Sequence, residues 1–290
     1  MDGSKGRLIS DKNDPADKSR SESSPASNLR SLQFSPMRLK LTIAYDGRPF
    51  SGWQSQAGGN TVQDIIQAAM QEVAKQPVRI HGSGRTDTGV HALAQVAHFD
   101  APPEISMNPF NWVPALNCKL PPTIRIMACE EVATDFHSRF SATGKIYRFD
   151  LCTDPVLPPL KAGLAWHLPR QLDADALWDA LALFLGRHDF HAFAAYRGNE
   201  TPEIDWSRTI ESIELTTMQD GYRITYTGDG FLYKMVRLLT GGAVHAAQGR
   251  IRLDDLAALL DQSAGLPLGK SPLCAPADGL YLEAVVYPSP

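Results

Sequence analysis

The chain has 290 residues, of which 43% are hydrophobic, and a formal net charge of −4 at pH 7. This length and apolar content suffice for one large domain or two modest ones with buried cores. No uninterrupted apolar run reaches the roughly 18 residues that a membrane-spanning helix needs, so we expect no membrane span. The acidic balance argues against a protein coated in positive charge, so any contact with RNA must use a local basic cleft.

Residues 1–36 are rich in Ser, Asp, Lys and Pro and contain few large apolar residues. Such a segment cannot bury enough surface to offset the entropy of ordering, so we predict a disordered tail. The segment lacks an apolar signal core, and its acidic residues are unlike the acid-poor transit peptides of organelles. We therefore expect a cytoplasmic protein.

The first predicted elements follow this tail. Residues 39–47 alternate like a strand and end in an Asp-Gly turn, and a helix is expected to follow after Asn60 or Thr61 as its cap and to end at Pro77. A Gly-rich turn leads into another alternating segment. The strands expected after the helix cover 90–99, 123–133 and 145–152.

The second part of the chain repeats this theme after a Pro-rich connection. A helix is expected to begin at Asp173, and two strands and two more helices follow, over 208–217, 221–228, 231–249 and 254–262. Strands clustered around a few long helices favour an α+β fold with a largely antiparallel sheet. We predict two similar α+β halves, 37–153 and 154–290, which share one central sheet and have the active-site cleft between them.

The four cysteines are widely separated and show neither a C-x-x-C pair nor a metal-finger spacing. This pattern predicts reduced thiols, mostly in the core, and no metal site. The residues are Cys118, Cys129, Cys152 and Cys274.

The segment GRTDTGVHA, residues 84–92, is the strongest candidate for a functional loop. Its glycines allow a sharp backbone that projects Asp87 outward, and Arg85 can pair with the carboxylate and keep it ionised. Asp87 is then available as a nucleophile or base. On spacing alone, the commoner role of such an Asp is to stabilise the turn.

Five segments, spread between residue 39 and residue 287, carry a pattern of a known family. In chain order they are YDGRPFSGWQSQ followed by TVQD, GRTDTGVHALAQVAHF, FHSRFSATGKIYRF, FLYKMVR and DGLYLEAV. Together and in this order, they resemble the tRNA pseudouridine synthase A family.

The resemblance implies an enzyme that isomerises uridine to pseudouridine in tRNA without a cofactor. Asp87 corresponds to the family's catalytic carboxylate, which becomes covalently attached to the target nucleotide. The expected substrate is the anticodon stem-loop, at tRNA positions 38, 39 and 40, and the expected assembly is a homodimer. Whether Asp87 attacks the ribose, attacks the base or takes a proton from the sugar stays open.

Tyr147 and Arg237 are the other two principal candidates. By resemblance, Tyr147 stacks on the flipped-out target base; without the resemblance, a half-buried strand tyrosine is the better interpretation. Arg237 lies in an apolar segment expected to be helical, where a lone charge is costly unless paired. Asp87 is its natural partner, and an ordinary surface charge is the alternative.

Other basic and imidazole side chains are weaker candidates. Arg85 and Lys145 are candidates for phosphate contacts. The cleft could be extended by Arg139, Arg148 and Lys234. The spacing of His91, His98 and His137 fits no metal motif, so we interpret them as packing or RNA-facing groups.

Two other functions are weighed against the enzyme. Asp87-Thr88-Gly89 matches the tripeptide of aspartic proteases, but those enzymes need two such carboxylates and the chain has one copy. A non-catalytic RNA-binding protein fits the α+β pattern, but the chain lacks the aromatic signature of an RNA-recognition sheet.

Overall fold

A computed structural model describes residues 37–170, 172–196, 204–260 and 274–288. The tail predicted over 1–36 lies outside the described residues, as do the last residues of the helix predicted over 254–262. Every helix in the described ranges is too short or too polar to cross a lipid bilayer.

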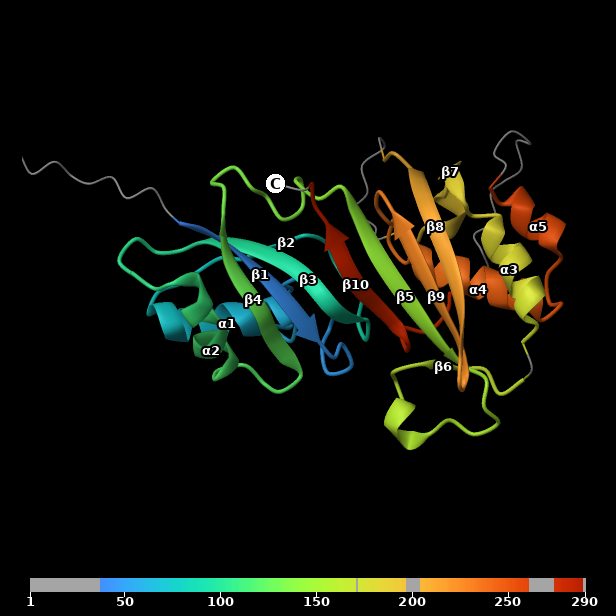
Figure 1. Cartoon of the computed structure of the whole chain (residues 1–290), viewed down its shortest axis with the longest axis horizontal. Helices are drawn as coiled ribbons and strands as arrows, with labels where there is room; N and C mark the ends of the chain where they lie inside the picture. Colours follow the sequence, from blue (N-terminus) through green and yellow to red (C-terminus); the bar gives the residue numbers. More distant parts are fainter. Residues whose placement is uncertain (1–36, 171, 197–203, 261–273, 289–290) are drawn as a thin grey trace, which may run out of the picture. The chain divides into compact units, whose positions relative to one another are not determined.

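One sheet of ten strands organises the described part of the chain (Figure 1). Its main path runs β4-β1-β3-β10-β5-β9-β8-β7, with short β2 paired to β3 and short β6 paired to β5. All neighbours are antiparallel except β3 with β10 and β5 with β6. The strands are β1 (Arg38–Tyr45), β2 (His81–Gly82), β3 (His91–Asp100), β4 (Ile124–Val132), β5 (Gly144–Cys152), β6 (Trp166–His167), β7 (Gly186–Asp189), β8 (Ser207–Met218), β9 (Gly221–Gly228) and β10 (Leu280–Val286).

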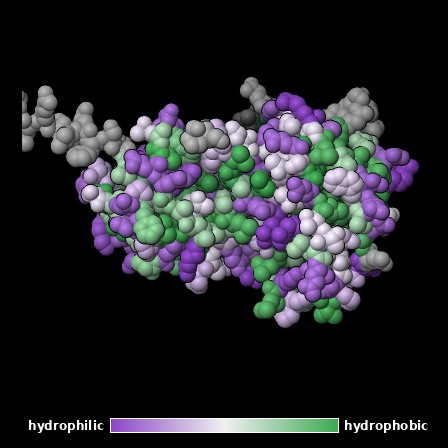
Figure 2. All heavy atoms as spheres, viewed as in Figure 1, coloured by the Kyte–Doolittle hydropathy of each residue, from purple (hydrophilic) through white to green (hydrophobic). Residues whose placement is uncertain are grey.

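The helices pack on the two ends of this sheet. Figure 1 shows α1 and α2 against the strands of the first part of the chain, and α3, α4 and α5 gathered beside β8 and β9. Over the face drawn in Figure 2, hydrophobic residues are interspersed with hydrophilic ones. The helices are α1 (Val62–Ala74), α2 (Pro109–Asn117), α3 (Ala174–Ala182), α4 (Met235–Ala247) and α5 (Leu253–Ala258), with short 3-10 turns at Pro159–Lys161 and His191–Phe193.

Local sequence explains why these elements form. Strict alternation in β1 buries Leu39, Leu41 and Ile43 while their neighbours remain half-exposed. Helix α1 begins where the Thr61 side chain accepts the backbone N–H of Asp64. The predicted α+β class and its largely antiparallel sheet are therefore confirmed.

Strand β10 connects the two ends of the sheet, because it lies between β3 and β5. Residues from the two predicted halves are thus interleaved along one sheet, and residues 35–290 form a single compact unit. The division at residues 153 and 154 stays a prediction.

Three sequence predictions differ from the structure. The helix predicted from residue 231 begins only at Met235, because Lys234 has a left-handed backbone with φ of +60°. Helix α2 was not predicted, because it contains Pro109 and Pro114 and proline is unfavourable inside a helix. Cys118 and Cys274 are exposed, so the expectation of mostly buried thiols was wrong.

Buried His98 makes the fold sensitive to acid. Its Nδ1 accepts the backbone N–H of Ser138 at 3.1 Å, which requires an unprotonated nitrogen, and burial together with His81 and His137 lowers its pKa from 6.5 to about 4. Because the folded chain disfavours the charged ring, this contribution to stability is complete above pH 6.5 and declines as the pH falls toward 4.

We expect the free energy of unfolding to drop between pH 7.5 and pH 5 by about 2 kcal/mol more in the wild type than in His98→Gln, which has no titrating ring. Urea denaturation at the two pH values measures this difference. Equal pH dependence in the two proteins would contradict the assignment.

Candidate functional site

A cleft of about 930 Å³ lies beside the loop that carries Asp87. Its walls come from segments far apart in the sequence: the loop between β2 and β3, strand β5, residues 229–237 leading into α4, and residues of β7 and β8. The cleft therefore draws on both predicted halves.

The residues around Asp87 are fixed by their neighbours. The Thr86 hydroxyl lies 2.8 Å from the phenol oxygen of Tyr45, and the Thr86 carbonyl accepts the backbone N–H of Trp53 at 3.1 Å. After Asp87, the backbone N–H of Val90 donates to the Asp87 carbonyl and closes a tight turn. Thr86 and Val90 are buried on either side, while Asp87 lines the cleft.

A glycine opposite the loop permits this close approach. Gly52 has φ of +85°, and a Cβ there would lie 2.7 Å from the Thr86 carbonyl oxygen. Only glycine combines that backbone conformation with that contact. The loop's position therefore depends on the segment before α1 as well as on its own sequence.

The predicted contact between Asp87 and Arg237 is present. Arg237 Nη1 lies 3.4 Å from Asp87 Oδ2, and the two side chains are only 15% and 18% exposed. Arg237 is oriented by a second bond, in which its Nε donates to the Ala275 carbonyl at 2.8 Å. A guanidinium held in this way favours the ionised form of the carboxylate.

Tyr147 lies in β5 and lines the same cleft. Its ring is 8% exposed and meets the Phe231 ring edge to face, with centroids 5.1 Å apart. Burial raises the pKa of the Tyr147 phenol well above its ordinary value, and the charge of nearby Asp87 adds to this effect. Tyr147 is thus a neutral aromatic group beside the candidate carboxylate.

Strand alternation separates the predicted basic residues of this region. Lys145 lies two residues before Tyr147 and lines the cleft, whereas Arg148 does not. Arg148 instead lies over the ring of Tyr281, 4.3 Å from its centroid, and 3.6 Å from an oxygen of Asp150. The prediction that Arg148 extends the cleft was wrong.

The remaining predicted residues divide between cleft and core. Arg139 and Lys234 line the cleft. Exposed Arg85 also lines it and donates to Gln54 at 3.2 Å; its predicted pairing with Asp87 stays a prediction. His91 and His98 are buried packing groups in β3, and half-buried His137 packs against His98.

Several cleft residues were missed by the sequence analysis. Trp53, Phe231, Arg187 and Arg208 line the cleft but belong to separate elements. Arg187 and Arg208 lie in the paired strands β7 and β8, whereas Trp53 and Phe231 lie outside the strands, so no short motif unites the four. Trp53 and Phe231 belong to segments that resemble the family, and the two arginines carried no distinguishing signal.

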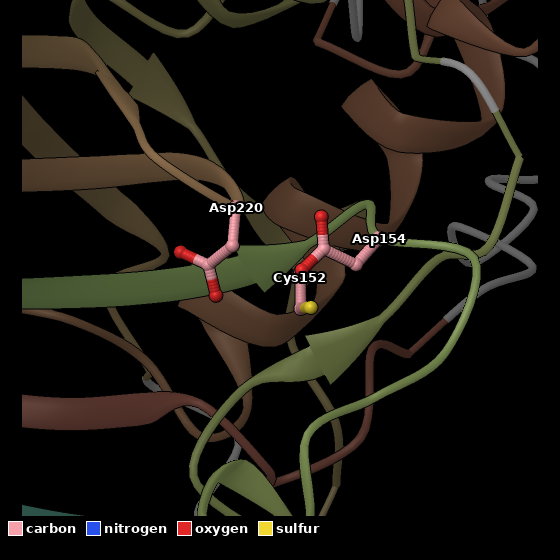
Figure 3. Close-up of side chains that lie close together, drawn as sticks. All are labelled: Cys152, Asp154 and Asp220. Atoms are coloured by element: carbon pink, nitrogen blue, oxygen red, sulfur yellow. The ribbon is translucent and has the colours of Figure 1, made fainter.

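A second group of possible ligand side chains lies outside the cleft (Figure 3). Ligand atoms of Cys152, Asp154 and Asp220 lie within 4.8 Å of one another at the end of β5. The Asp220 carboxylate already pairs with the ammonium of Lys161, which supplies the positive charge that an ion would bring. The expectation of no metal stays a prediction.

Comparison with known proteins gives consistent results. A family model described as tRNA pseudouridine synthase matches residues 41–141 and 180–288. A protein of Akkermansia muciniphila named tRNA pseudouridine synthase A is 53% identical over 254 residues, which cover 87% of this chain and 95% of that protein. Proteins of the same name are 43% identical in Solidesulfovibrio magneticus and 40% identical in Bacillus pumilus, each covering 87% of this chain and 92% and 99% of the relative.

The close packing at Gly52 predicts a specific loss of stability. Gly52→Ala is expected to lower the free energy of unfolding by about 2 kcal/mol, because the new Cβ strains a left-handed backbone and meets the Thr86 carbonyl. Gly58→Ala is the matched control, since Gly58 has no positive φ and no atom within 4 Å of a Cβ. Urea denaturation measures both variants, and equal stability of the two would show that the Asp87 loop is not held by this contact.

Proposed function

The chain belongs to the tRNA pseudouridine synthase family, and from this premise we infer the chemistry of its cleft. The reaction is the isomerisation of uridine to pseudouridine in tRNA, and the protein is an isomerase. In this reaction the bond between uracil N1 and ribose C1′ breaks, the freed base turns, and a bond forms between C5 and C1′. The cleft must therefore activate the nucleoside and retain the freed base.

Asp87 is the group that we propose performs the activation. It is the only acidic side chain among the cleft residues that sits on the glycine-flanked loop, and it faces the guanidinium of Arg237. An ionised carboxylate in this position can act as nucleophile or base toward the ribose or the uracil. This single contact carries the proposal, because a guanidinium beside a largely enclosed carboxylate favours its charged form.

Tyr147 is proposed to hold the target base. A uridine paired or stacked in RNA must leave its stack to reach a buried carboxylate, and an aromatic face compensates for the lost stacking. The Tyr147 ring lines the cleft and packs against the Phe231 ring in a T-shaped arrangement. Its neutral phenol leaves the charge of Asp87 undisturbed.

Basic side chains around this pair are proposed to bind the phosphates on either side of the target uridine. Arg85 and Lys145 line the cleft on the Asp87 side and on β5, respectively. The proposed substrate region is the anticodon stem-loop of tRNA, and the proposed assembly is a homodimer in the cytoplasm. The substrate region and the homodimer follow from the family resemblance.

Replacing the carboxylate tests the proposal. Asp87→Asn is expected to lower the rate of pseudouridine formation in unmodified tRNA by at least about a thousandfold, because the amide of equal size is neither nucleophile nor base. Asp255→Asn serves as the control, since Asp255 is an exposed acidic residue of α5 that pairs with Arg252. Mapping of pseudouridine after incubation measures both, and wild-type rates in Asp87→Asn would reject the assignment.

A further inference from the structure

The cleft concentrates positive charge in an acidic protein. Among the described residues, seven basic and three acidic side chains line it, although the whole chain carries a net charge of −4. The acidic residues other than Asp87 are engaged in backbone turns: Asp205 accepts the N–H of Ser207, and Asp229 accepts the N–H of Thr209. The positive charge of the cleft therefore exceeds what the Asp87 carboxylate offsets, and the cleft suits a large anionic ligand.

Three of these cations lie close enough to act on one another. Arg139 comes from the loop between β4 and β5, Lys145 from β5 and Arg208 from β8. Half-buried Lys145 lies against Gly84, where its ammonium leaves no room for a Cβ. The charges of Arg139 and Arg208 act on Lys145 and, after burial itself, lower its pKa to about 8.

In the described part of the chain no carboxylate forms an ion pair with these three cations, although the charge of Asp205 acts on Arg208. Arg208 donates to the backbone carbonyls of Asp205 and Ser207, and Arg139 lies over an aromatic ring, but neither they nor Lys145 form an ion pair there. Three mutually repelling cations, one of them half-buried, are costly in the free protein. An anion bound between them removes that cost, and the anion that an RNA substrate offers is a phosphodiester.

An aromatic side chain adjoins the cations. Phe140 is 76% exposed and follows Arg139, whose guanidinium carbon lies 5.6 Å from the centroid of the Phe140 ring. The ring of His137 lies 4.3 Å away on a tilted plane, so the Phe140 ring is supported by its own loop. An exposed aromatic ring next to a guanidinium is a stacking platform for a nucleobase.

We propose that Arg139, Lys145 and Arg208 bind the phosphodiester of a nucleotide flanking the target uridine, and that Phe140 stacks on the base of that nucleotide. This inference rests on the proposed function, because it takes the cleft to be the place where Asp87 acts. It adds a second subsite, built from both ends of the sheet, that fixes the path of the RNA strand. Arg139 links the two parts, since it contacts the cleft and the Phe140 ring.

Steady-state kinetics on the full chain with unmodified tRNA test the subsite. Arg208→Gln and Arg139→Gln are expected to raise KM roughly tenfold with a smaller effect on kcat, and to lower the slope of log(1/KM) against log salt by about one. Phe140→Ser is expected to raise KM roughly tenfold without changing the salt slope, because it removes stacking and no charge. The matched controls are Arg170→Gln and Phe110→Ser, whose side chains are exposed outside the cleft.

The outcomes separate the subsite from the proposed function. If the wild type forms no pseudouridine, or Asp87→Asn retains the wild-type rate, the proposed function fails. If the wild type is active, Asp87→Asn is not, and the arginine variants keep the KM and salt slope of Arg170→Gln, the phosphate subsite is overturned. A Phe140→Ser protein with unchanged KM overturns the base-stacking part. This conclusion holds whether or not sedimentation velocity shows a change in its oligomeric state.

Discussion

The site depends on the close contact between the backbone of the Asp87 loop and the chain segment before α1. Gly52 and Trp53 approach the Thr86 carbonyl, and Tyr45 meets the Thr86 hydroxyl, so the residue before Asp87 is anchored from two elements. Because residues on either side of Asp87 are buried, the loop stays in place while the Asp87 carboxylate faces the solvent. Catalytic groups need this fixed geometry, because displacement of about 1 Å can cost a hundredfold in rate.

The positive charge of this protein is concentrated in one place, although the net charge of the chain is negative. The whole chain is acidic, yet its cleft is basic, because cations from separate elements line it. A general excess of positive charge would attract any nucleic acid over the whole surface. Local concentration restricts attraction to the place where the base must enter.

Much of the fold was predictable because local patterns dominate it. Alternation located β1, β3, β5, β8 and β9 to within a few residues, and capping side chains located the starts of α1 and α3. The start of α4 was not predictable, since nothing in the sequence of residues 231–234 indicates the left-handed backbone at Lys234.

The candidate site was predictable only in part. The Gly-rich loop and a lone charge in an apolar segment drew attention to Asp87 and Arg237, and their contact is present, but the catalytic role of Asp87 was inferred only from the family resemblance. Arg148 was misplaced because neighbouring strand positions face opposite ways, and Arg208 was overlooked because only the place of β8 in the sheet brings it near the cleft.

The position of β10 has a further consequence, for synthesis on the ribosome. Its residues, 280–286, insert between β3 and β5, so the strands that carry the two walls of the cleft stay unjoined until β10 has been translated. A nascent chain without β10 therefore exposes two unpaired strand edges and has no assembled cleft, which couples the onset of activity to the synthesis of this strand.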